Sequence, residues 1–240
     1  MRQGAPERGA AVILAMMTIL FLAALGVVVT LTTSTEMIIA GGYRGGEAAR
    51  YAAEAAAERA LADLSQAGDW NGFVGGTARS AFVDGPPGGV RALSDGTTID
   101  LDAQVNMANC QSSAGCLVAE MNAVTADRPW GLNNPRWRLL AYGPLEDLAP
   151  EADVASPYYG VVLVGDDSLE NDDDPTRDGN DAVNPGSGII AIRALAFGPR
   201  GASRAIELTV ARPPSDVQSG SYNDRARPTG VRILSWREVR

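Results

Sequence analysis

The sequence contains no histidine and no lysine, and all 20 of its basic residues are arginine. Histidine is the most common general base and metal ligand, and lysine is the residue that forms Schiff bases, so these kinds of chemistry lose their usual residues. The chain also lacks the G-x-S-x-G, P-loop and H-E-x-x-H motifs, and no G-x-G-x-x-G follows a predicted strand. We therefore expect a protein that is not an enzyme.

Positive charge is scarce as well, since 20 basic residues stand against 29 acidic ones and the formal net charge is -9 at pH 7. The excess is local. Residues 166–181 contain eight acids and a single base, Arg177, which gives this segment -7 of the -9. Nucleic acid is itself a polyanion, so it is not an expected partner.

The acidic segment contains part of a calcium-binding pattern. Oxygen-bearing side chains occupy alternate positions there, with Gly179 among them, as in an EF-type loop. The candidate calcium ligands are Asp174, Thr176, Asp178 and Asn180. The twelfth position, where such a loop has a bidentate glutamate, is Pro185. We favour a solvated acidic loop, with calcium binding as the alternative, and we expect no other cofactor.

Charge is absent altogether from residues 10–35. A hydrocarbon core of about 30 Å needs about 20 helical residues, and residues 10–30 supply 21 apolar or small ones. Arg2 and Arg8 precede the run and no basic residue follows before Arg44, so the positive-inside rule places the N-terminus in the cytoplasm. The run is longer than the apolar core of a secretory signal and no A-x-A-like site follows it, which favours a retained single span.

The helical pattern continues beyond this apolar run. Residues 47–64 are rich in alanine, and small or apolar residues recur there at helical spacing between charged ones, with Arg50 and Glu54 as an i,i+4 pair. Glycines gather at residues 41–46, and each weakens a helix by up to about 1 kcal/mol relative to alanine. We therefore expect helix from residue 10 to residue 64, with a bend or a soft spot at the glycines.

Strand-like segments appear after residue 65 and a glycine-rich stretch. Aliphatic and β-branched residues gather in short runs, which is typical of strands. The predicted strands are residues 97–105, 137–142, 159–164, 188–197, 205–210 and, as a final edge strand, 231–236. Residues 198–201 (GPRG) predict a hairpin turn. No strand alternates with a helix of 10–15 residues, so we predict an α+β fold in which the long N-terminal helix packs its second half on an antiparallel sheet.

Cysteine and tryptophan are both rare. The two cysteines, Cys110 and Cys116, have the spacing of neither a CxxC motif nor a zinc site. If this part of the chain is exported to an oxidising compartment, we expect a disulfide worth about 2 kcal/mol, and two free thiols are the alternative. The four tryptophans are interpreted as core or half-core anchors rather than as a binding surface. They are Trp70, Trp130, Trp137 and Trp236.

Both ends of the chain resemble a known family. The segment ERGAAVILAMMTILFLAALG, followed by EMIIAGGYRGGEAARYAAEAAAERAL, is similar to the start of PilX-type minor pilins of type IV pili. Their pattern is a short leader ending in glycine, an apolar helix, a Met-Ala/Gly-Asn/Gly-Tyr-Arg turn and an Ala-Glu-Ala segment. The similarity extends to NPRWRLLAYGPL, YYGVVLVGDD, IIAIRALAFGPRGASRAIELTVAR and VRILSWREVR, whereas residues 66–130 match poorly.

The resemblance implies a pilin-like fold and a processed N-terminus. A prepilin peptidase would cut after Gly9 on the cytoplasmic side, and Ala10 would become the N-methylated first residue. Most major pilins have a glutamate at the fifth mature position, whereas this chain has Leu14. A position at the tip or in the initiating complex is therefore favoured over repeated use along the shaft. The implied regions are a leader (1–9), a transmembrane and assembly helix (10–31), an amphipathic continuation (32–65) and a periplasmic or extracellular β-rich domain (66–240).

The function implied by the resemblance is structural. The protein would prime or tip type IV pili, which serve adhesion and twitching motility, after waiting in the bacterial inner membrane with its β-rich domain in the periplasm. Its partners would be other minor pilins, the major pilin, a PilY-type tip adhesin and the prepilin peptidase. The alternatives are a minor pseudopilin of a type II secretion system, where tip members also lack the fifth-position glutamate, and a single-pass membrane binding module that never assembles.

Overall fold

The computed structural model describes residues 8–67, 69–148, 155–170, 172–179, 188–212 and 230–239. The chain divides into two compact units, Met1–Arg44 and Gly45–Arg240. Helix α1 (Arg8–Gln66) begins in the first unit and ends in the second, and it is continuous through residues 41–46. The predicted long helix is therefore confirmed, and the glycines do not interrupt it.

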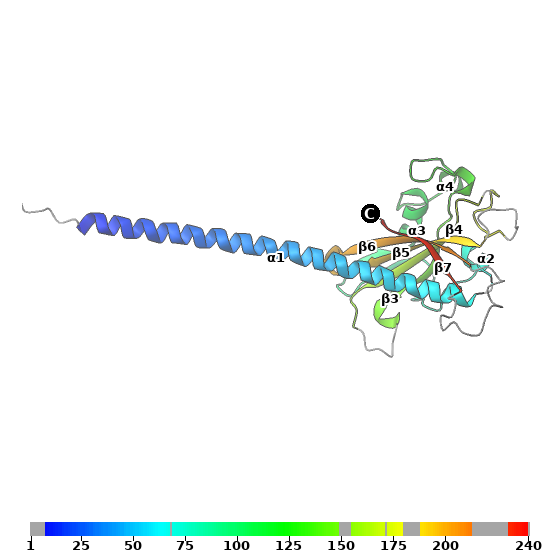
Figure 1. The fold of residues 1–240 in the computed structure, drawn as a ribbon, viewed down its shortest axis with the longest axis horizontal. Coiled ribbons are helices and arrows are strands. Elements are labelled where there is room, and N and C mark those ends of the chain that lie inside the picture. Colours follow the sequence, from blue (N-terminus) through cyan, green and yellow to red (C-terminus); the bar gives the residue numbers. More distant parts are fainter. Residues whose placement is uncertain are drawn as a thin grey trace, which may run out of the picture. The chain divides into compact units, whose positions relative to one another are not determined.

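The second unit is built on a five-stranded antiparallel sheet in the order β3-β4-β5-β6-β7 (Figure 1). Its strands are β3 (Arg138–Pro144), β4 (Tyr159–Asp166), β5 (Ile189–Phe197), β6 (Ser203–Ala211) and β7 (Arg232–Val239). Each strand pairs with the next one along the chain, and the short turn η4 (Pro199–Gly201) joins β5 to β6. The α+β fold, the hairpin turn and the final edge strand are confirmed.

Both faces of this sheet are covered, which is why every residue of β4 is buried. On one face the second part of α1 packs against alternate strand residues such as Leu140, Val162 and Ile206. On the other face lie residues of β2 (Thr98–Asp100) and α3 (Leu101–Cys110). The remaining elements are β1 (Val90–Ala92), which pairs with β2, the short helices α2 (Asn71–Val74) and α4 (Val118–Met121), and the 3-10 turns η1 (Gly131–Asn133) and η2 (Leu145–Leu148).

An alanine surface of α1 makes the contact with the sheet. The alanines of this surface that are fully buried are Ala49, Ala53, Ala56 and Ala60. Their small side chains allow a close approach, since a Cβ added to Gly160 of β4 would lie 3.1 Å from the Cβ of Ala56. Beside this surface, the part-buried Arg50 pairs with Glu54 at 2.5 Å, as the i,i+4 spacing predicted.

The prediction of a strand at residues 97–105 is wrong after the first few residues. The chain turns into helix α3 because the side chain of Asp100 accepts hydrogen bonds from the backbone N–H groups of Asp102 and Ala103 at 2.9 and 3.3 Å. This is an N-cap, which satisfies donors that the first helical turn leaves unpaired. The alternation in TTIDLDAQV concealed a helical spacing of apolar residues from Leu101 onward.

The tryptophans divide between core and surface. Trp70 and Trp137 are buried, at 0% and 5% exposure, as the core interpretation predicted. Trp130 and Trp236 are 44% and 46% exposed, so these two fit only the half-core part of that interpretation. Trp236 lies in β7, the edge strand, where no further strand or helix covers it among the described residues.

Candidate functional site

The first part of α1 presents an apolar surface around its whole circumference. Every residue from 10 to 40 is exposed, including large ones such as Leu14 and Phe21 at 64% and 65%. The helix is long and apolar enough to cross a membrane. Residues 10–30 rise by about 32 Å, close to the roughly 30 Å of a hydrocarbon core. A continuous apolar surface of this size needs a cover of lipid or protein.

The polar side chains within this apolar surface are satisfied internally. Each hydroxyl between residues 10 and 35 donates a hydrogen bond of 2.8 to 3.0 Å to a backbone carbonyl three or four residues earlier. These residues are Thr18, Thr30, Thr32, Thr33, Ser34 and Thr35. Unpaired donors are costly in hydrocarbon, and this pattern leaves none of these hydroxyls unpaired. The surface is therefore chemically suited to lipid or to a packed helix bundle.

The predicted processing junction lies at the start of the same helix. Gly9 and Ala10 belong to the first turn of α1, and Leu14 follows one turn later. The first acidic residue after Ala10 is Glu36, far along the helix. Leu14 itself is exposed.

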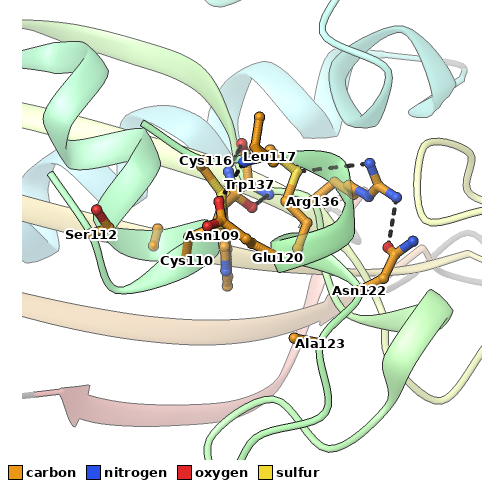
Figure 2. The surroundings of a disulfide bond; sticks show 12 residues. Asn109, Cys110, Ser112, Cys116, Leu117, Glu120, Asn122, Ala123, Arg136 and Trp137 are labelled. Carbon is orange, nitrogen blue, oxygen red and sulfur yellow. Dashed lines mark hydrogen bonds between the residues drawn. A yellow bond between two sulfur atoms is a disulfide. The ribbon is translucent and has the colours of Figure 1, made fainter. Parts of the chain in front are cut away.

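A disulfide between Cys110 and Cys116 closes the end of α3, with the two Cα atoms 5.7 Å apart (Figure 2). Its neighbour Asn109 ties this region to the sheet. The Asn109 side chain donates to the Trp137 carbonyl at 3.0 Å and accepts from the Trp137 N–H at 2.9 Å. Figure 2 shows Asn109 and Trp137 beside the bridge. The half-buried disulfide therefore follows directly on a buried residue that is hydrogen-bonded to the start of the sheet.

Arg128 is a second anchor of this region, and nothing in the sequence pattern indicated it. Its guanidinium is buried and donates to the carbonyls of Ala108 at 2.9 Å, Pro135 at 2.9 Å and Met121 at 3.2 Å. Burial lowers the pKa of Arg128, with repulsion from Arg136 and Arg193 as smaller causes. One buried cation thus joins three segments that lie 7 to 20 residues away from it along the chain.

We expect the double variant Cys110→Ala/Cys116→Ala to lose about 2 kcal/mol of unfolding free energy, because a short closed loop restricts the unfolded chain by about that amount. Urea titration of the full chain in detergent micelles, followed by circular dichroism, measures the loss. A reductant should lower the wild type to the level of the variant and leave the variant unchanged. A wild type that is insensitive to reductant would contradict this expectation.

Three carboxylates of the acidic segment converge at the end of β4. Asp166 is the last residue of that strand, Glu170 lies in the turn after it, and Asp178 lies further along the loop. Their residues are only 3%, 1% and 1% exposed, and one oxygen of each lies within 4.8 Å of the other two. We call Asp166, Glu170 and Asp178 the carboxylate cluster. The prediction of a solvated loop is wrong for these three side chains.

Two contacts hold Asp178 in the cluster. The N–H of Gly188 donates to its Oδ1 at 2.6 Å, and Arg212 donates to its Oδ2 at 3.2 Å. The Arg212 guanidinium also lies over the ring of Trp70, 4.8 Å from its centre. The loop is thereby fastened to the residues just before α2 and just after β6.

Burial and mutual repulsion change the acidity of the cluster. Burial, and then the charge of Glu170, raise the pKa of Asp166 to about 9. Burial also raises the pKa of Glu170 and that of Asp178. Repulsion from Asp178 and Asp172 adds smaller contributions to the raised pKa of Asp166. The cluster therefore favours either a bound proton or a bound cation.

Of the four calcium ligands predicted from the sequence, only Asp178 belongs to the cluster. The Asp174 Oδ1 accepts hydrogen bonds from the hydroxyl and the N–H of Thr176, at 2.6 and 3.3 Å. Asn180 lies outside the described residues. The sequence pattern did not single out Asp166 or Glu170 as ligands. Asp166 lies at every-second-residue spacing from Val164 and Val162, so it faces the same side of the strand as these buried valines, and this spacing could have identified it.

Two features therefore distinguish the described part of the chain, namely the uncovered apolar surface of α1 and the carboxylate cluster in the second unit. Comparisons with protein-family models, curated proteins and solved structures found no match. Both features are interpreted below from their own chemistry.

Proposed function

We propose that the protein is a minor pilin, a structural subunit that primes or tips a type IV pilus. The observation that supports this function is α1 itself. Its first part is apolar all round, and its second part packs an alanine surface on an antiparallel sheet. Lipid covers the first part before assembly, and the helices of neighbouring subunits cover it afterwards. The same apolar surface thus suits the membrane and the filament, because neither environment exposes it to water.

Leu14 supports a specialised position in the filament. A carboxylate inside an apolar helix bundle is costly unless it is paired, and in most shaft subunits the fifth-position glutamate is paired with a neighbour's N-terminal amine. A subunit with leucine there cannot pair with that amine. It is better suited to the tip or the initiating complex, where one such contact is not required.

The proposed life cycle begins in the bacterial inner membrane. The N-terminus lies in the cytoplasm and the β-rich domain lies in the periplasm. This orientation is favoured because the two leading arginines precede the span, in agreement with the positive-inside rule. Prepilin peptidase cuts after Gly9, and Ala10 is N-methylated. The subunit then joins other minor pilins, the major pilin and a PilY-type tip adhesin, and it contributes to adhesion and twitching motility.

Intact-mass spectrometry of the protein from its native membrane tests this proposal. The expected mature chain begins at Ala10 and carries one added methyl group. The variant Gly9→Leu should keep its leader, because the peptidase requires a small residue before the cut, whereas Gly4→Leu makes the same change within the leader and should be processed normally. A wild-type chain that starts at Met1, or that is cut after Thr30, would rule the proposal out and favour a non-assembling membrane module.

Deletion of the gene separates the pilus from a type II secretion pseudopilus, because a pseudopilin would pass the same processing test. Loss of surface pili and of twitching motility is expected for a minor pilin. Loss of protein secretion with intact pili would instead identify a minor pseudopilin.

A further inference from the structure

We propose that Asp166, Glu170 and Asp178 form a calcium site in the second unit. The site is independent of the pilin proposal, because it depends on the loop after β4 and not on the apolar part of α1. The ion would join the end of β4 to the loop that leads to β5, and it would stabilise the sheet at this end.

The geometry of the cluster fits one calcium ion. Three atoms that lie within 4.8 Å of one another share a point at most about 2.8 Å from each of them. Calcium binds oxygen at about 2.3–2.6 Å, so a shift of a few tenths of an ångström completes the contacts. Magnesium requires about 2.0–2.1 Å and octahedral geometry, which would demand a larger contraction.

A buried oxygen in the cluster points to a missing ligand. Asp166 is only 3% exposed, and its Oδ1 has no hydrogen-bond partner among the residues that the structure describes. A buried polar atom without a partner is rare in folded proteins and calls for an ion, a water molecule or another compensation. Because one oxygen of each of the three carboxylates lies within 4.8 Å of the other two, a cation is the ligand that satisfies them together.

The charge balance favours a divalent cation bound through oxygen. Three carboxylates converge in the cluster, and Arg212 pairs with one of them, Asp178. The cluster offers oxygen atoms alone, which suits calcium and magnesium, whereas zinc prefers nitrogen and sulfur ligands. A divalent ion would bind the three converging carboxylates together.

Calorimetric titration of the full chain in detergent micelles, after removal of metals with EDTA, tests the site. We expect one calcium ion per chain, binding at least tenfold tighter than magnesium, and a melting temperature that rises with calcium concentration. The variant Asp166→Asn keeps the shape of the side chain and removes its charge. It should bind calcium at least tenfold more weakly, and its circular dichroism in EDTA should match that of the wild type.

Two matched variants in the same loop are the controls. Asp172→Asn removes an exposed carboxylate, and Asp174→Asn removes the one that binds Thr176 and that the EF-type pattern would use. Both should change calcium affinity less than threefold. The site is overturned if the wild type shows neither heat nor a melting shift at millimolar calcium, or if Asp174→Asn abolishes binding while Asp166→Asn does not. Neither result would alter the processing expected at Gly9.

Discussion

Replacing Trp70 with alanine is expected to lower the free energy of unfolding by about 3–5 kcal/mol, the usual loss for a large buried aromatic. Trp70 is fully buried and packs in the core between α1 and the sheet. Its Nε1 donates to the carbonyl of Leu64 in the last turn of α1 at 3.1 Å. Its ring also supports the Arg212 guanidinium, which pairs with Asp178. The substitution removes packing, a buried hydrogen bond and this support at once.

Urea denaturation of the full chain in detergent micelles, followed by circular dichroism, measures this loss. Trp130→Ala is the matched control, because the same side chain is 44% exposed there. It should cost less than about 1 kcal/mol, as is usual for surface substitutions. Equal losses in the two variants would show that Trp70 does not anchor the core.

Enlarging Ala56 to leucine is expected to destabilise the second unit by about 1–3 kcal/mol or more, because overpacking a closely packed interior forces strain on its neighbours. Ala56 is fully buried and lies against Gly160 of β4. The two backbones are so close that even a Cβ added to Gly160 would lie only 3.1 Å from the Cβ of Ala56. The helix would have to move away from the sheet. Leucine is itself a good helix former, so the expected loss comes from packing and not from helix propensity.

Ala55→Leu is the control for this prediction, because it makes the same change one residue earlier on the exposed side of α1. Thermal unfolding of the full chain in detergent micelles should show a melting temperature close to that of the wild type for Ala55→Leu and several degrees lower for Ala56→Leu, since about 1 kcal/mol corresponds to 2–4 °C at this size. The prediction fails if both variants melt together.

The elements that the sequence predicted well are those with a long or strongly periodic pattern. The apolar run and its alanine-rich continuation identify α1 to within a few residues, and aliphatic runs locate the strands of the sheet. The segment 97–105 failed because a short alternating pattern fits a strand and a capped helix equally well, and the side chain of Asp100 decides between them. The sequence could not say which tryptophans are fully buried and which, like Trp130 and Trp236, are only half-buried, because residue type alone does not reveal which faces of the fold are covered.

The sequence by itself determined that this protein has an apolar helix able to cross a membrane and an antiparallel sheet that receives the end of that helix, because hydrophobic period and length are local properties. Only the tertiary structure decided the carboxylate cluster. Asp166, Glu170 and Asp178 look like members of one solvated acidic loop until the chain folds back and buries them near Arg212. Burial depends on residues distant in the sequence, and so does the change from a solvated acid to a candidate metal ligand.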